Sequence, residues 1–267
     1  MSPLLIALIC LPIAALGAMV GIGGGVFFVP IWLAAGSSFQ AATATSLVMI
    51  AAMGASASTV YLRKRLVEPA LVLAVGPSAW LFSFLTGALS GRLDERLLRI
   101  AFGIVLVPVA LLLLRETKPA AQAAQSASPK GRWRFQRERE GERYTVQVPA
   151  AIGAGALAGL LSGLFGIGGG IIVVPILTLG FRIPTRVAVA TSTLLLAVTS
   201  AVGAGGHAVA GHVPWLAAGL GAAAAVLGAQ IGARLTARIK PRRLRQLLAL
   251  VLLIVAIWVE IQAFRLA

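Results

Sequence analysis

Hydrophobic residues along the chain form runs of about 20 residues, the length that spans the hydrocarbon core of a bilayer. These runs are apolar on every face, and the short segments between them hold most of the charges. Because lipid offers no partners for backbone N–H and C=O groups, we expect helices rather than isolated strands. Two of the apolar stretches, 3–35 and 147–181, are interrupted by a cluster of glycines. The other predicted helices are 41–62, 69–90, 97–114, 187–206, 213–234 and 246–263.

Composition supports a membrane protein. Hydrophobic residues make up 59% of the chain, charged residues only 12%, and the mean hydropathy is +0.95. A soluble domain carries about twice that charged fraction. The net charge is +15, but the basic residues lie in loops between apolar runs, where orientation signals of membrane proteins occur. We therefore expect the lipid bilayer as a partner, and no nucleic acid.

The chain contains an internal repeat. The sequence from Gly21 to Pro30 reads GIGGGVFFVP, and GIGGGIIVVP begins at Gly166, 145 positions later. ATATS at 42–46 is followed by AVATS at 188–192, 146 positions later. The sequence therefore predicts a membrane repeat over 1–115, a cytoplasmic basic linker over 116–146 and a second membrane repeat over 147–267. The linker is either flexible or partly ordered on the membrane surface, with Trp133 and Phe135 at the lipid headgroups.

The placement of basic residues indicates how the glycine-broken stretches cross the bilayer. If each crossed once, the two sides would carry twelve and eleven Lys and Arg residues. If each instead returns to its own side as a hairpin, one side carries nineteen and the other four, which is the asymmetry of the positive-inside rule. The predicted fold is therefore an all-α polytopic membrane protein. It has two inverted repeats, each a glycine-broken hairpin plus three transmembrane helices, with the linker cytoplasmic and both termini outside.

The glycine clusters are the first candidate site. Adjacent glycines weaken a helix and permit positive φ, so each cluster predicts a break before a half-helix. The free N–H groups at the start of that half-helix suit an anion. The alternative is a tight turn that only allows helices to pack closely. The candidate anion-binding residues are Gly23, Gly24, Gly25, Gly168, Gly169 and Gly170.

Hydroxyl side chains near the start of the following helices are the second candidate. Thr45 and Ser46 in the first repeat match Thr191 and Ser192 in the second. A hydroxyl can donate to an oxyanion without adding a fixed charge. The alternative is hydrogen bonding between helices or to the helix's own backbone. Gln40, just before the first pair, is a further candidate donor.

Other recurring residues indicate structure rather than chemistry. His207 and His212 are predicted to lie in a short external loop, and without an acid or cysteine nearby they make a poor metal site. No metal or cofactor is expected. Glycine pairs four residues apart predict close helix packing. They are Gly17/Gly21, Gly87/Gly91, Gly155/Gly159, Gly159/Gly163 and Gly228/Gly232.

Acidic residues are scarce, which bears on both catalysis and energy coupling. Of the eight, only Glu260 falls within a predicted span. No paired carboxylates and no nucleophile–base set are visible, so the sequence does not indicate an enzyme. Proton- or sodium-coupled carriers usually place carboxylates inside the membrane. We therefore expect passive transport driven by gradient and membrane potential.

The paired GIGGG motifs, each followed by an Ala-Thr-Ser helix start, resemble the TauE/SafE sulfite exporter family. The resemblance implies a polytopic inner-membrane transporter that moves sulfite, organosulfonates or related sulfur anions, usually outward. The family's glycine motifs map onto 21–25 and 166–170, and its helix starts onto Thr45/Ser46 and Thr191/Ser192. A carrier or channel for another small anion, such as a carboxylate, and a membrane assembly factor remain as alternatives.

Overall fold

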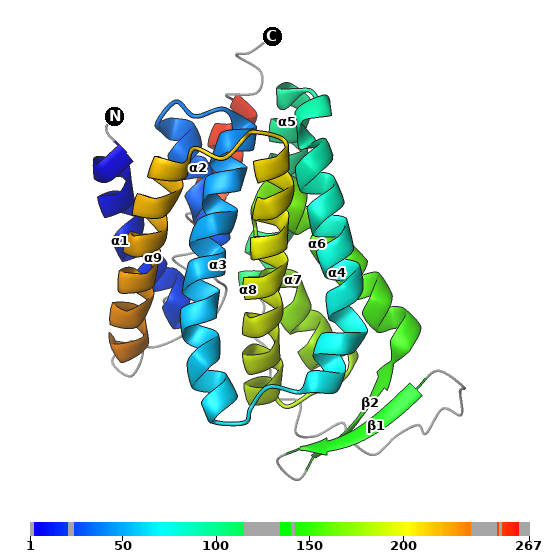
Figure 1. Ribbon diagram of the computed structural model, residues 1–267. Helices are drawn as coiled ribbons and strands as arrows, with labels where there is room; N and C mark the ends of the chain where they lie inside the picture. The colour runs from blue at the N-terminus through cyan, green and yellow to red at the C-terminus, as the bar shows by residue number, and fades with distance from the viewer. Residues whose placement is uncertain are drawn as a thin grey trace.

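The chain folds almost entirely into helices. The computed structural model describes residues 3–20, 24–114, 134–139, 142–235, 250 and 253–261. Residues 253–261 form a helix near the C-terminus, and a short antiparallel hairpin precedes α6 (Figure 1). The elements are α1 Pro3–Val20, α2 Gly25–Ala34, α3 Phe39–Arg63, α4 Pro69–Leu89, the 3-10 turn η1 Ser90–Arg92, α5 Glu95–Leu114, β1 Arg134–Arg139, β2 Glu142–Gln147, α6 Val148–Phe165, α7 Gly170–Pro175, the π-helical η3 Ile176–Gly180, α8 Thr185–Val209 and α9 Trp215–Leu235.

The described helices lie where the hydrophobic runs predict them, with ends set by local chemistry. The hydroxyl of Ser38 accepts the Ala41 N–H at 3.3 Å at the start of α3. The Glu95 carboxylate accepts the Phe39 N–H at 2.9 Å, so the acid also caps that end. Pro69 opens α4, where its missing N–H costs nothing. Of the predicted helix 246–263, only 250 and 253–261 lie within the described residues.

Both glycine-broken stretches enter the bundle and turn back. In Figure 1, α1 and α3 begin at the same end of the molecule, and α2 leads back to that end. At the opposite end, beside the β-hairpin, α6 and α8 begin. As a result, α3 and α8 run in opposite directions while packing along each other. The other major contacts pair α1 with α9, α4 with α6, and α4 with α8.

Glycines on α6 allow the close contact with α4. A Cβ at Gly155 or Gly159 would overlap the carbonyl oxygens of Val75 and Ala79. One turn on, a Cβ at Gly163 would overlap the α4 backbone again. Only a glycine fits where two backbones approach this closely. The prediction that these glycines serve helix packing is confirmed.

The hairpin occupies part of the segment predicted as a linker. Tyr144 and Val146 on β2 are 3% and 0% exposed and pack into a hydrophobic cluster with Leu71 and Val187, near the starts of α4 and α8. This part of the segment is therefore anchored to the helices. Phe135 lies in β1, whereas Trp133 lies outside the described residues.

The outer surface of the bundle is hydrophobic. Leu73, Val209 and Leu216 are 70%, 76% and 73% exposed, and many other large aliphatic side chains also point outward. Soluble monomers rarely expose continuous apolar surface on this scale. Four helices within the described part of the chain are long and apolar enough to cross a membrane: Phe39–Arg63, Pro69–Arg92, Val148–Phe165 and Thr185–Val209. The protein is embedded in the membrane.

We expect Gly159→Ala to destabilise the bundle by about 1–3 kcal/mol, because the added methyl group forces α6 away from the α4 backbone. Gly153→Ala on the same helix is the matched control, since nothing lies within 4 Å of its added Cβ. Thermal unfolding of the purified proteins in detergent measures both. Equal midpoints for the two variants would contradict the packing described here.

Candidate functional site

Each half of the chain breaks at a glycine in the left-handed conformation. Gly24 precedes α2 with φ of 67°, and Gly169 precedes α7 with φ of 69°. Gly166 and Gly168 also have positive φ, at 65° and 78°. A Cβ is strained at such angles, which explains the choice of glycine. The equivalent candidate Gly23 lies outside the described residues.

The two breaks touch each other inside the bundle. A Cβ at Gly25 would lie 2.8 Å from the carbonyl oxygen of Ile167 and 2.9 Å from that of Gly166. On the other side, the Ile50 side chain covers Gly25, and Leu196 covers Gly170 in the same way. The structure therefore brings the start of α2 against the break before α7, with aliphatic side chains over both.

Ser46 ties the two breaks together. Its hydroxyl donates to the Gly166 carbonyl at 2.8 Å and lies 3.4 Å from the Gly25 carbonyl. Ser192, the matching residue of the second half, donates instead to Val189 on its own helix at 3.1 Å. The two equivalent hydroxyls thus have different surroundings.

The remaining predicted donors are engaged or lie elsewhere. Thr45 donates to the carbonyl of Ala41 on its own helix at 2.8 Å, while the Thr191 hydroxyl accepts the Glu68 N–H at 3.0 Å. Gln40 lies in the first turn of α3, at the end of that helix away from the cavity described below. The structure does not bring these three together with the glycines.

The first amides of α7 are also engaged locally. The Gly170 N–H donates to the Gly168 carbonyl at 2.8 Å, and the N–H groups of Ile172 and Val173 donate to the Gly169 carbonyl at 3.1 Å. Phe27 makes the same kind of bond to Gly24 at 3.0 Å. These N–H groups at the two breaks therefore already have acceptors within the protein.

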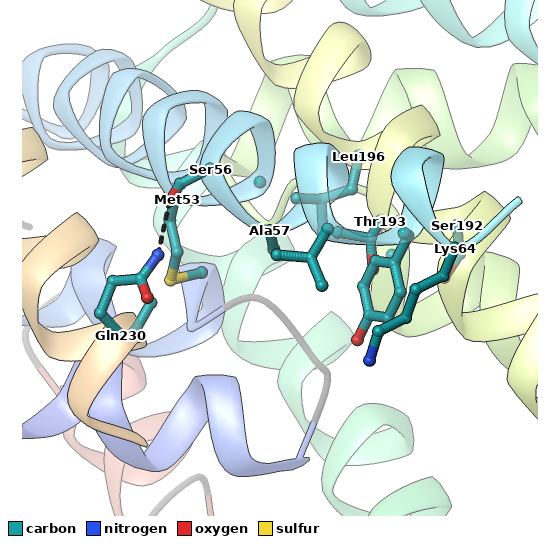
Figure 2. A pocket seen from close by; sticks show the side chains of 13 residues that line it. Met53, Ser56, Ala57, Lys64, Ser192, Thr193, Leu196 and Gln230 are labelled. Carbon is teal, nitrogen blue, oxygen red and sulfur yellow. Dashed lines mark hydrogen bonds between the residues drawn. The ribbon is translucent and has the colours of Figure 1, made fainter. Parts of the chain in front are cut away.

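A cavity of about 280 Å³ opens beside the second break. Among the residues predicted from sequence, Gly170 and Ser192 line it. Figure 2 shows side chains of α3, α8 and α9 around it, with Gln230 on one side and Lys64 on the other. The lining residues are Met53, Gly54, Ser56, Ala57, Val60, Tyr61, Lys64, Gly170, Ser192, Thr193, Leu196, Ala229 and Gln230.

The polar groups of the cavity are suited to an anion. Lys64 supplies a positive charge at the exposed end of α3. Hydroxyls come from Ser56, Tyr61, Ser192 and Thr193. Those of Ser192 and Thr193 donate to the Val189 carbonyl at 3.1 and 2.7 Å, so they must rotate to donate to an anion. Gln230 donates to Ser56 at 2.9 Å, so an amide and a hydroxyl meet at the cavity wall (Figure 2). No acidic side chain is among the described lining residues.

The α3 residues of this cavity were not predicted from the sequence, although their spacing indicates one face of a helix. The lining positions from Met53 to Lys64 recur with a spacing of three and four residues, which places them on one face of a helix. Ser56, Tyr61 and Lys64 are the polar residues on that face of the helix. A helix-period search for polar positions would have found them.

Comparison with known proteins agrees with a membrane transporter. The chain is 31% identical over 230 residues to the probable membrane transporter protein YunE of Bacillus subtilis, covering 81% of this chain and 82% of the relative. It is 26% identical over 195 residues to the probable membrane transporter protein MJ0441 of Methanocaldococcus jannaschii, covering 70% of this chain and 66% of the relative. No solved structure matches. The family described as sulfite exporter TauE/SafE matches residues 5–259, and this chain therefore belongs to the TauE/SafE family of membrane transporters.

Proposed function

We propose that this transporter exports a small sulfur-containing anion, sulfite or an organosulfonate, across the inner membrane. The observation that carries the proposal is the cavity beside Gly170, whose polar side chains are hydroxyls, an amide and the Lys64 ammonium. Hydroxyl and amide donors can replace the water around an oxyanion, and the lysine favours negative charge. Its volume of about 280 Å³ suits a small solute with a few waters, since a water occupies about 30 Å³.

The antiparallel placement of equivalent helices supports an inverted repeat, and with it transport through this cavity. The equivalent helices α3 and α8 run in opposite directions, and α1–α9 and α4–α6 are equivalent contacts when the halves are exchanged. Transporters of this plan place the solute where broken helices of the two halves meet. The contact between Gly25 and the Gly166 carbonyl is such a meeting point.

The positions of basic residues support an orientation. Arg63 and Arg186 lie at the end of the bundle that bears the hairpin, whereas Arg92 and Arg99 lie at the other end. By the positive-inside rule, together with the nineteen-to-four count, the hairpin end is cytoplasmic and both termini are outside. The cavity reaches Lys64, at the hairpin end of α3, and so faces the cytoplasm, as an exporter loading its solute requires.

The long apolar helices lack the acidic side chains that proton- or sodium-coupled carriers use. The sequences of α3, α4, α6 and α8 contain no Asp or Glu. Glu260, which lies against Gly103 of α5, is the carboxylate that the described helix 253–261 contributes, near the end of that helix. Because the four long apolar helices have none, we infer transport driven by the gradient and the membrane potential. An anion leaving a cell that is negative inside gains about 2.3 kcal/mol per charge per 100 mV.

The second candidate is a carrier or channel for another small anion, such as a carboxylate. The same donors would serve it, because hydroxyls, an amide and an ammonium recognise any oxyanion. Family membership favours transport over catalysis or assembly. Competition between sulfite and acetate in one flux assay separates the two candidates.

We expect Lys64→Gln to raise the KM for sulfite efflux from liposomes about tenfold, equivalent to roughly 1.4 kcal/mol of lost attraction. Arg63→Gln is the matched control, because Arg63 carries the same charge one residue away but does not line the cavity. The difference between the variants should shrink at high salt, which screens exposed charges. An equal KM for the two variants would remove Lys64 from the solute path.

We expect Ser46 to have a structural role and Ser192 a role in solute binding. Ser46→Ala should lower stability by about 1–3 kcal/mol, because it leaves the buried Gly166 carbonyl without its donor. Ser192→Ala should leave stability nearly unchanged and slow sulfite efflux, because its hydroxyl bonds only locally and lines the cavity. Melting curves and flux of both variants test this. The reverse assignment of the two effects would contradict the geometry.

A further inference from the structure

Equivalent positions on α3 and α8 line the cavity at one end of the transporter and are fully buried at the other. Both helices have 25 residues, and their bounds differ by 146, the same offset as that of the ATATS and AVATS segments. By this register, Tyr61 corresponds to His207 and Thr193 corresponds to Leu47. Tyr61 and Thr193 line the cavity, whereas His207 and Leu47 are both 0% exposed. The space equivalent to the cavity is therefore closed at the opposite end.

His207 joins three segments at that closed end. Its Nε2 lies 2.9 Å from the Gly163 carbonyl of α6, and its Nδ1 lies 3.3 Å from the Ser90 hydroxyl of η1. A carbonyl oxygen only accepts, so Nε2 carries a proton and donates it. A Cβ at Gly87 would lie 3.1 Å from the ring, so α4 leaves room for it. The prediction that His207 lies in a loop is wrong, because His207 is in the last turn of α8.

Glycines on α8 let α4 close over the same space. A Cβ at Gly203 would overlap the Ser83 hydroxyl, and one at Gly206 would overlap the Phe84 carbonyl. The Ser83 hydroxyl also donates to the carbonyl of Thr199 on α8 at 3.0 Å. The sequence therefore permits tight contact between α4 and α8.

The matching face of α3 is bulkier. Ala57 and Val60 stand at the positions equivalent to Gly203 and Gly206, and both line the cavity. Ala229 and Gln230 of α9 line the same cavity, so the space between α9 and this face of α3 is not filled. The open end of α3 thus carries larger side chains than the equivalent closed end of α8.

We propose that His207, together with the Gly203 and Gly206 contacts, forms the gate that keeps the far end of the transporter closed. Release of the His207 bonds lets η1 and the end of α4 leave α8, and this opens a second cavity at Ser46 and Leu47 while the one described above closes. His207 is a positioning residue, since it holds helices and does not touch the solute. The inference rests on the inverted repeat proposed above, but not on which anion is carried.

Cysteine labelling tests the gate without any transported solute. Cys10 is the chain's single cysteine and is buried, so a Cys10→Ala background is free of other thiols. Two reporters, Leu47→Cys at the closed end and Thr193→Cys in the cavity, are labelled with a soluble maleimide in the purified protein. In the parent, the Thr193→Cys reporter should react and the Leu47→Cys reporter should be protected.

We expect His207→Leu to raise the labelling rate of the Leu47→Cys reporter about tenfold, the factor that the loss of one good hydrogen bond allows. The rate at the Thr193→Cys reporter should fall, because the two ends open alternately. His207→Gln, whose amide can still donate to the Gly163 carbonyl, should restore both rates. His212→Leu controls for ring contacts alone: the His212 ring lies 5.8 Å from His207 and against Gly91 of η1, whereas the bond to the Gly163 carbonyl is made by His207. It should change both rates much less than His207→Leu does.

Two results would overturn the proposal. One is a Leu47→Cys rate that stays at the parent value in His207→Leu. The other is a rise at both reporters together, which means that the substitution loosens packing in general. If His207→Leu does not fold, His207→Tyr takes its place, because tyrosine is the residue at the equivalent position 61. The same change in both labelling rates is expected. Because the labelling experiment contains no anion, a negative labelling result does not bear on the proposed substrate. Absence of sulfite efflux likewise does not bear on the proposed gate.

Discussion

The contact between the two glycine-rich breaks is the constraint on which the remaining structure depends. Gly25 lies against the carbonyls of Gly166 and Ile167 at distances that no Cβ tolerates, and the Ser46 hydroxyl satisfies the Gly166 oxygen. Within a bilayer, backbone can leave the helical form only where the protein itself provides partners. The two breaks lie against each other, with Ile50 and Leu196 over them, so each break supplies protein surroundings for the non-helical backbone of the other.

From this contact follows an asymmetry between two halves of related sequence. Ser46 donates to the break, whereas the equivalent Ser192 donates to Val189 on its own helix and lines the cavity. The cavity accordingly lies beside Gly170 and reaches Lys64, while the equivalent space is filled by α4 packed on α8. If the two halves form the proposed inverted repeat, this asymmetry is what alternate opening of the two ends requires.

Much of the helical framework was predictable, because the length of an apolar run and the conformational demand of GIGGG are local properties. The helices from 41–62 to 213–234 were found within a few residues, and the breaks at Gly24 and Gly169 were located from glycine alone. The hairpin was not predicted, since its order depends on Tyr144 and Val146 reaching a distant cluster. The cavity and the burial of His207 depend equally on which helices meet, and a linear pattern does not contain that information.

Movement of an anion across the membrane is measured as an electrical current. Proteoliposomes containing the purified protein are exposed to a sulfite concentration jump on a solid-supported membrane, and the transient current is compared with that of empty liposomes. For sulfite we expect a protein-dependent current with the sign of a moving negative charge, and for acetate at the same concentration a smaller one. No sulfite current, together with a current for acetate, would contradict the assignment of a sulfur anion as the transported solute.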